Sequence, residues 1–594
     1  MQLKRTIIAL ISAFATLSMA AFDEDDFSSG VFVLNEDWYG HQNSTINMWY
    51  PDDTTDPDNP VYYRVFQSVN AGMEIGCTAQ YAQIFGGKIY IMAKQHKDPG
   101  ANIAGGRLTV VDAATMRCIA QFPVINPNGY VADEGNTSTG VITGTALGDG
   151  RACCGVTPEK VYLGTSNGIY ILDTRAMQIT GPIPGTENEL CTGDENNIDG
   201  QGPLYQNQIG IMIRTQDYIF AIKQDDGILV VDPVTDQIVN KIPGCFSTMV
   251  QGADGSLWAG MNLASADETN EFGVPLNHYP YGNSGSAWQG NGLLRIDPYT
   301  LETKQVNLYL GGVPQSWYAW TAGKLAASAK RNVLYFTYAD PSLGASTWFS
   351  DSKLYRYDID NDLTELIYDS SLDGNLWFYS SSLRVSPVDD NLYCHFYYGS
   401  NIANQSWIYR RYTDAGSGIE PNAEWRLISN YWYPAMFLFP DCKVPVVSKS
   451  MPSSVILGAE PLTIDLANMA DDDDTPQVSI VKRIISNTNP ENVKAQIIRG
   501  ELVLTSLKPG DADITIQFDS NGLTVNHTID VHATVAGISD IISDDTVGNY
   551  RVYSIAGAEL RQGVGTRRQA VDGLPNGFYI LTLDNHRAKI HINN

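Results

Sequence analysis

One sequence pattern returns about every 60 residues and constrains the fold more than any other feature. Each copy is a short apolar stretch that ends in Asp and is followed by a turn. An Asp in this position accepts a hydrogen bond from the backbone N–H two residues later, which closes a tight turn between strands. The seven copies end at Asp52, Asp112, Asp173, Asp232, Asp297, Asp358 and Asp414.

Further β-rich runs surround each copy, so every repeat supplies about four strands, and no helical periodicity separates them. Seven four-stranded units predict an all-β fold, with a seven-bladed β-propeller over residues 22–442. A closed ring removes the exposed sheet edges that invite aggregation. We expect Val31–Leu34 and Met436–Phe439 to complete the blades where the ring closes.

The start of the chain predicts export. Lys4 and Arg5 precede an apolar stretch over residues 7–19, and Ser18-Met19-Ala20 offers small residues for cleavage, so we assign residues 1–21 to a signal peptide. No Cys follows it for a lipid anchor, and no later run reaches the roughly 18 apolar residues of a transmembrane helix. We therefore expect an extracellular or outer-membrane cell-surface location.

Charge and cysteine content exclude further classes. With 38 basic against 66 acidic residues the net charge is −28, which repels phosphate backbones and argues against a nucleic-acid partner. The eight cysteines contain no C-x-x-C pair, so a zinc ribbon or a thioredoxin-like site is not expected. The disulfide pairing stays open; we favour a bond from Cys153 or Cys154 to Cys191.

The chain changes character after residue 442, because all 11 Trp lie between Trp38 and Trp432. Short alternating strands over residues 443–536 predict a β-sandwich, residues 537–550 a linker, and residues 551–594 a last small β domain. The four consecutive aspartates of the sandwich offer the oxygen ligands that Ca²⁺ prefers, although a solvated acidic loop explains them as well. They are Asp471, Asp472, Asp473 and Asp474.

Both small domains carry a resemblance to surface modules. Leu462–Leu466 and Pro509–Ile516 resemble strands of bacterial cadherin-like or Ig-like modules. Val552–Gly557, Leu574–Ile580 and Lys589–Ile592 resemble the C-terminal sorting domain of the type IX secretion system. That second resemblance implies passage across an outer membrane.

The sequence contains no convincing catalytic motif, so we expect a protein that is not an enzyme. Gly164–Gly168 matches G-x-S-x-G, but it falls between two predicted strands, whereas a nucleophile elbow needs a strand–turn–helix. The four histidines of the propeller region are scattered along the chain.

Aromatic residues gather in one set of loops. Loops between the second and third strands and segments that lead into the next blade share one propeller face, and the former vary greatly in length. Aromatic rings with amide donors suit a bulky organic ligand or a sugar, although such rings also pack between blades. The candidate ligand-binding residues are Trp38, Tyr39, Tyr81, Gln206, Trp288, Trp317, Trp320, Trp348, Trp377, Tyr379 and Trp432.

The propeller region also carries a family resemblance. Gly30–Met48, Gly227–Thr235 and Asn291–Thr300 resemble secreted and surface propellers of the Bacteroidetes type, which are YncE-like and related to vitamin B12-binding surface propellers. The resemblance implies capture of a cobalamin-like nutrient and hand-over to a TonB-dependent outer-membrane transporter. The missing anchor Cys and the two extra domains depart from that family. Glycan binding, surface adhesion and, as a weaker alternative, a carbohydrate-active enzyme stay open.

Overall fold

The computed structural model describes residues 27–52, 61–126, 130–131, 142–143, 148–187, 208–223, 226–244, 246–261, 292–308, 324–338, 352–398, 406–428, 432–534, 547–555, 557–584 and 586–592. The predicted signal peptide lies outside these residues. The chain forms two compact units. The first extends to Val444 and includes Asp472–Ile480 and Ser520–Leu523; the second holds Pro445–Asp471, Val481–Asp519 and the chain from Thr524 onward.

The first unit contains six four-stranded antiparallel sheets and one three-stranded sheet among its described residues. The first four-stranded sheet consists of β3 (Cys77–Phe85), β4 (Lys88–Gln95), β5 (Leu108–Asp112) and β6 (Cys118–Phe122). The second consists of β9 (Gly150–Thr157), β10 (Lys160–Thr165), β11 (Gly168–Asp173) and β12 (Gln178–Thr180). The third consists of β13 (Ile209–Arg214), β14 (Ile219–Lys223), β15 (Gly227–Asp232) and β16 (Gln237–Pro243). The fourth sheet consists of β17 (Phe246–Gln251), β18 (Leu257–Met261), β19 (Gly292–Ile296) and β20 (Thr303–Val306). The fifth consists of β21 (Leu325–Ala327), β22 (Val333–Tyr338), β23 (Lys353–Asp358) and β24 (Leu363–Asp369). The sixth consists of β25 (Leu376–Val385), β26 (Leu392–Tyr398), β27 (Trp407–Asp414) and β28 (Ile419–Arg426). The three-stranded sheet consists of β2 (Thr45–Trp49), β1 (Val31–Asn35) and β29 (Pro434–Leu438). The other described elements of this unit are the helix α2 (Val65–Val69) and the two-stranded pair of β7 (Tyr130–Val131) and β8 (Ile142–Thr143). Three short 3₁₀ helices complete the list: η1 (Phe27–Ser29), η8 (Ser370–Leu372) and η10 (Gln477–Ser479).

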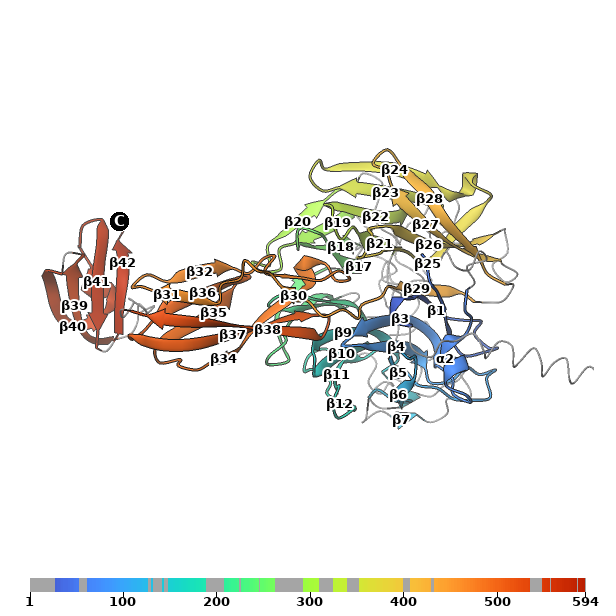
Figure 1. Cartoon of the computed structure of the whole chain (residues 1–594), viewed down its shortest axis with the longest axis horizontal. Coiled ribbons are helices and arrows are strands. Elements are labelled where there is room, and N and C mark those ends of the chain that lie inside the picture. The colour runs from blue at the N-terminus through green and yellow to red at the C-terminus, as the bar shows by residue number, and fades with distance from the viewer. Residues whose placement is uncertain are drawn as a thin grey trace, which may run out of the picture. The chain divides into compact units, whose positions relative to one another are not determined.

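These sheets follow one another around a ring (Figure 1). The inner strand of each sheet contacts the inner strand of the next, in the order β3, β9, β13, β17, β21, β25 and β29, and β29 contacts β3 again. This arrangement confirms the prediction of an all-β chain with a propeller-type fold.

The repeated aspartates close the turns between the third and fourth strands. Thr115 N–H donates to the Asp112 side chain at 2.8 Å, while five later copies accept from the backbone N–H two residues on, at 2.8 to 3.0 Å. Those five are Asp173, Asp232, Asp297, Asp358 and Asp414. The turn chemistry predicted from the repeat is therefore confirmed at these positions.

The two ends of the first unit meet in one sheet. β1 pairs antiparallel with β29, with Val33 opposite Phe437, as the sequence predicted for the closure. The fully buried Trp49 of β2 packs against Tyr409, Trp425 and Phe437, with ring centroids 5.1, 5.2 and 6.0 Å apart. Aromatic packing thus joins the closing sheet to the β25–β28 sheet before it.

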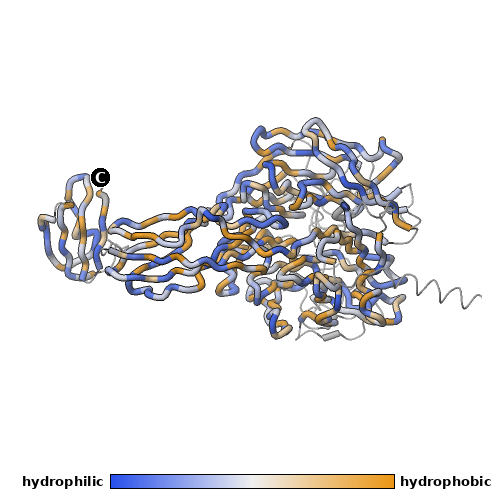
Figure 2. Tube along the Cα trace, viewed as in Figure 1, coloured by the Kyte–Doolittle hydropathy of each residue, from blue (hydrophilic) through white to orange (hydrophobic). Residues whose placement is uncertain are grey.

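Four β sheets hold the strands described after residue 445, two larger ones, a two-stranded one and a terminal one. The first has the order β31 (Ser454–Leu457), β38 (Leu523–Ala533), β37 (Gly510–Ser520) and β34 (Val481–Asn487), and the second β32 (Leu462–Asp465), β36 (Glu501–Ser506) and β35 (Val493–Ile498). β30 (Val446–Val447) pairs with β33 (Ala470–Asp471). Hydrophobic and hydrophilic residues alternate along these strands, as half-buried strands require (Figure 2).

The terminal sheet has the order β40 (Glu559–Thr566), β39 (Val547–Ser554), β41 (Gly577–Leu583) and β42 (His586–Ile592), with α3 (Arg567–Val571) after β40. β39 begins at Val547, inside the range expected to be a linker. It starts there because Val547 already pairs with Thr566 and the strand carries the fully buried Val552 into the core of this sheet.

Neither Cys153 nor Cys154 forms the disulfide that we favoured, because both are free thiols buried on β9. The Sγ of Cys153 donates to the carbonyl oxygen of Tyr90 at 3.7 Å. Among the described helices, none has the length and apolar character needed to cross a membrane.

Candidate functional site

The strand order fixes where each inner strand begins. In a sheet of four antiparallel strands, the fourth strand ends at the same face of the ring at which the first strand began. Successive inner strands therefore all begin at one face of the ring. We call this side face A and the side where the inner strands end face B. The turn from β1 to β2 also lies at face A, because β1 runs antiparallel to the inner strand β29. The carboxyl end of β4 lies there too, because β4 runs antiparallel to the inner strand β3.

Every sheet of the ring places a polar side chain near face A. Six of them lie directly before the inner strand or within its first four residues, and the seventh follows β1, the strand paired with inner strand β29. All seven are at most 5% exposed, although such positions in an inner strand are normally apolar. We call this set the polar ring. It consists of Glu36 after β1, Gln80 on β3, Arg151 on β9, Gln208 before β13, Thr248 on β17, Lys324 before β21 and Tyr379 on β25.

A buried acid and a buried base form the charged part of this site. Burial raises the pKa of Glu36 well above its usual range, although Lys94, Gln80 and Tyr379 lie close enough to oppose that shift. Burial and the neighbouring Arg151 lower the pKa of Lys94, against the attraction of Glu36. Both groups are therefore shifted toward their neutral forms.

Several polar atoms of the ring make no hydrogen bond of good geometry within the described part of the chain. They include both side-chain amide atoms of Gln208, both of Gln80, the hydroxyl of Thr248 and Oε1 of Glu36. More than nine in ten buried polar groups in proteins have a partner, because each one without a partner costs about 1–3 kcal/mol. A cluster of such groups at one face therefore makes face A the candidate binding site.

A tied turn flanks the polar ring at the same face. The buried carboxylate of Asp98 accepts from the N–H groups of Gly40 and Gly100, at 2.7 Å each, and its own N–H donates to Asn43 Oδ1 at 2.7 Å. These bonds fasten the β1–β2 turn to the segment that follows β4. The turn presents two predicted ligand residues: Trp38, whose ring lies 4.0 Å from that of His41, and Tyr39, which is 48% exposed.

The other described candidates lie in different surroundings. Tyr379 belongs to the polar ring, and Trp377 is partly buried on the same strand, where its Nε1 donates to Asn375 at 3.2 Å. Trp432 is 1% exposed, stacks on Tyr63 at 5.1 Å and donates to the Ile428 carbonyl, so it serves the core. Tyr81 lines a pocket nearer to face B. Gln206, Trp288, Trp317, Trp320 and Trp348 lie outside the described residues.

Two of the four aspartates proposed for Ca²⁺ contact each other, because the N–H of Asp474 donates to Asp472 Oδ1 at 3.1 Å. Asp471 pairs through its backbone with Val446, Asp473 forms a surface ion pair with Lys443, and Asp474 Oδ2 accepts from two backbone N–H groups at 3.0 Å. Within the described ranges no three acidic, His or Cys side chains are grouped so that they could hold a metal ion. The calcium hypothesis therefore stays a prediction.

Sequence reasoning did not single out Glu36, Lys94, Arg151 or Thr248. A signal was present for one of them, because Arg151 is the one cation of its strand, β9. Such a residue is recognisable as part of a site only once the strands are arranged in a ring.

Comparison with known proteins places this region in a family. A family model described as "Domain of unknown function (DUF5074)" matches residues 29–440. The chain belongs to this family. The DUF5074 match covers all seven sheets of the ring and therefore the whole polar ring.

Among curated proteins, no match to this DUF5074 chain was found. Solved structures that resemble it include a quinonprotein alcohol dehydrogenase-like protein from Bacteroides thetaiotaomicron, with 14% identity over 70% of this chain and 79% of that one and a TM-score of 0.42. Apo AztD from Citrobacter koseri has 11% identity over 86% and 96% of the two chains, TM-score 0.33. The Cps50 (Swd1) beta-propeller domain from Myceliophteria thermophila has 10% identity over 61% and 92%, TM-score 0.31.

Proposed function

We propose that this protein is a non-enzymatic, ligand-binding β-propeller of seven blades, secreted or held at the cell surface, and that its ligand sits on face A over the polar ring. The observation that carries the proposal is the group of buried polar atoms at that face that make no hydrogen bond of good geometry to any described residue, above all both amide atoms of Gln208. A ligand that supplied the missing donors and acceptors would remove their desolvation cost.

The chemistry of the ring favours a highly polar ligand. Its two cations are Lys324 and Arg151, and Arg151 is paired with Asp149 at 3.3 Å. Gln80, Gln208 and Thr248 offer amide and hydroxyl groups, which both donate and accept hydrogen bonds. Glu36 and Lys94 are shifted toward their neutral forms, so they add further hydrogen-bonding groups and little net charge. A cobalamin-like nutrient with peripheral amides fits this chemistry and the family resemblance, and a glycan fits the same groups.

One observation favours a second candidate, a carbohydrate-active enzyme. A buried carboxyl with a raised pKa, such as Glu36, is a property of catalytic acids. Glycoside hydrolysis needs a second carboxylate across the scissile bond. The adjacent Asp37 is engaged with Thr45 at 2.7 Å and Gln42 at 2.6 Å, and the titrating neighbour of Glu36 is Lys94. Binding therefore remains the better-supported function.

A titration with matched variants tests the proposal. The protein from residue 22 onward is titrated by calorimetry with cyanocobalamin and with a panel of soluble glycans. Gln208→Leu keeps the side-chain volume and removes the amide, and Gln237→Leu on the exposed start of β16 is the control. We expect Gln208→Leu to bind at least about tenfold more weakly, because it loses one or two hydrogen bonds to the ligand, and Gln237→Leu to bind as the parent does. A ligand that binds both variants equally well would place the site elsewhere.

The flanking modules fit delivery to the cell surface. The proposal treats the two sheets of residues 454–533 as an Ig-like or cadherin-like sandwich and the β39–β42 sheet as a type IX sorting-like domain. A TonB-dependent transporter is the proposed receiver of a captured nutrient. Amino-terminal sequencing of the exported protein tests the first step, with a start at residue 22 expected and an intact residue 1 contradicting it.

A further inference from the structure

A second pocket lies at the centre of the ring, toward face B. It has a volume of about 290 Å³ and is lined by residues of six inner strands, from β3 to β25. Two segments from beyond residue 442, which belong to the same compact unit, contribute Ser479 and Asn521 to its wall. This pocket shares no residue with the polar ring.

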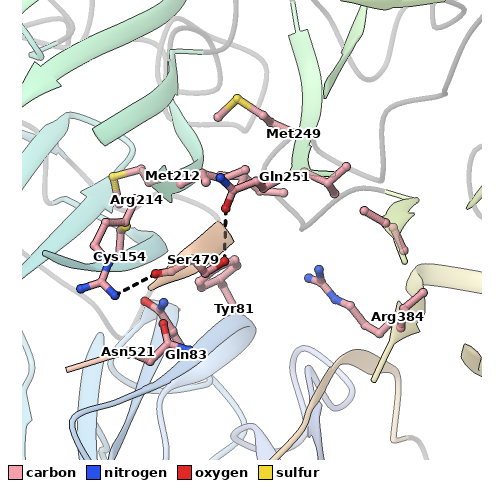
Figure 3. A pocket seen from close by; sticks show the side chains of 16 residues that line it. Tyr81, Gln83, Cys154, Met212, Arg214, Met249, Gln251, Arg384, Ser479 and Asn521 are labelled. Atoms are coloured by element: carbon pink, nitrogen blue, oxygen red, sulfur yellow. Dashed lines mark hydrogen bonds between the residues drawn. The ribbon is translucent and has the colours of Figure 1, made fainter. Parts of the chain in front are cut away.

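The two added segments are held by specific bonds. Ser479 Oγ donates to Gln251 Oε1 at 3.2 Å, and its carbonyl oxygen accepts from Arg214 Nη2 at 3.5 Å (Figure 3). The carbonyl oxygen of Asn521 accepts from the backbone N–H of Gly86 at 2.6 Å. These contacts make the pocket wall a built feature, because each segment is fastened to a different sheet of the ring.

Arg384 projects into this pocket from β25 (Figure 3). Its Nε and Nη2 are both buried, and neither makes a hydrogen bond within the described part of the chain. The described residues also give it no ion pair. Burial lowers the pKa of Arg384, and the phenol of Tyr81 is a titratable neighbour that opposes this shift.

Other arginines of the first unit have a partner, including Arg151, whose Nε and Nη1 also make no hydrogen bond within the described residues but whose Nη2 lies 3.3 Å from Asp149 Oδ2. Arg214 bonds to Ser479 and lies over the Phe85 ring at 5.3 Å, and Arg356 Nη1 contacts Asp414 Oδ1 at 2.6 Å. An arginine in a protein does not lose its proton, so burial without a partner is costly. The free pair on Arg384 is also specific, because Nε and Nη2 form the edge of the guanidinium that binds both oxygens of one carboxylate.

The rest of the pocket defines the body of such a ligand. Met212, Met249, Ile211 and Ala326 supply the apolar part of its wall, and Gln83 and Gln251 are among its polar residues. A volume of about 290 Å³ is at the lower end of the range for small-molecule sites. We propose that this pocket binds a small organic carboxylate, with the carboxylate on Nε and Nη2 of Arg384 and the short apolar body against the two methionines.

The test measures thermal unfolding of the full exported chain at constant ionic strength. Probes are butyrate, succinate, inorganic phosphate and sulfate. We expect a carboxylate to raise the Tm of the parent in a saturable way. Arg384→Met should raise the dissociation constant of that carboxylate at least about 30-fold, because it removes one partner of a buried charged contact. Arg426→Met, at an arginine whose side chain is 72% exposed, is the matched control and should bind as the parent does.

A second readout comes without any ligand. Because the unpaired charge is removed, Arg384→Met should have a higher Tm than the parent in a buffer without carboxylates, and this order should reverse when a carboxylate saturates the parent. If Arg384→Met does not fold, Arg384→Lys keeps the charge but loses the two-pronged edge, and it should bind the carboxylate about tenfold more weakly.

Three results would overturn the inference. They are equal shifts in the parent and in Arg384→Met for every probe, binding of phosphate or sulfate but of neither carboxylate, and parent-like carboxylate affinity in Arg384→Lys. Gln208→Leu, at the other face, should leave carboxylate binding unchanged. The outcome is therefore independent of whether the polar ring binds the proposed ligand.

Discussion

Replacing Glu36 by Gln removes the buried carboxyl of the polar ring and keeps its shape. The structure buries this carboxyl, and burial raises its pKa from 4.5 to about 7. Below pH 4.5 the carboxyl is protonated in the folded and the unfolded protein alike. Between pH 4.5 and about 7 the folded protein holds a proton that the unfolded chain has lost, so the stability of the parent falls as the pH rises.

The size of this effect follows from the shift. Each unit of pKa difference corresponds to about 1.4 kcal/mol, so the parent should lose about 3 kcal/mol across that interval relative to Glu36→Gln. Lys94 shifts in the opposite sense, and its contribution to stability rises with pH toward the ordinary lysine value. A Lys94→Met variant separates the two, since it should keep the downward slope that Glu36 causes.

The assay is urea unfolding at several pH values from 4.5 to 8. Tryptophan fluorescence reports only on the first unit in this chain, because all 11 Trp lie between Trp38 and Trp432. Glu420→Gln on the exposed edge strand β28 is the control and should follow the parent. Parallel pH profiles for the parent and Glu36→Gln would refute the reasoning, because they would show that Glu36 is charged and compensated in the folded state.

Three further predictions concern the packing that supports the site. Trp49→Ala should lower the stability of the first unit by about 3–5 kcal/mol in urea unfolding, because it leaves a cavity in the aromatic cluster at the closure. Tyr39→Ala, at a half-exposed ring, should change the stability little, and equal effects of the two variants would contradict the role of Trp49 in the closure. Asp414→Asn should cost about 3 kcal/mol by the same measurement, because the buried carboxylate partners Arg356 at 2.6 Å and Tyr335 at 2.7 Å; an unchanged midpoint would show that these bonds do not matter. Cys153 and Cys154 should react with a maleimide only after unfolding, since both are buried and burial raises the pKa of each thiol, for Cys154 to about 12; mass spectrometry that finds labels on the native protein would contradict their placement.

The repeat and the closure were predictable because their signals are local. An Asp that caps its own turn acts within three residues, so Asp232 or Asp297 can be read directly from the chain. The pairing of β1 with β29 follows from the same logic, because a ring leaves the first and last strands as each other's partners.

The polar ring was not predictable in the same way. Its members are dispersed along the chain from Glu36 to Tyr379, and no local pattern connects them. The aromatic signal was also ambiguous, because rings that pack between sheets and rings that face a ligand have the same composition. Trp432 shows this ambiguity, since it stacks on Tyr63 in the core.

The central claim is that face A binds a polar ligand through the polar ring. A crystal structure of the exported protein with the cobalamin or glycan that binds in the titration tests this claim most directly. The account predicts a ligand acceptor within about 3 Å of Gln208 Nε2 and a second polar contact to Gln80 or Thr248. A ligand bound away from these residues, with the Gln208 amide still without a partner, would contradict it.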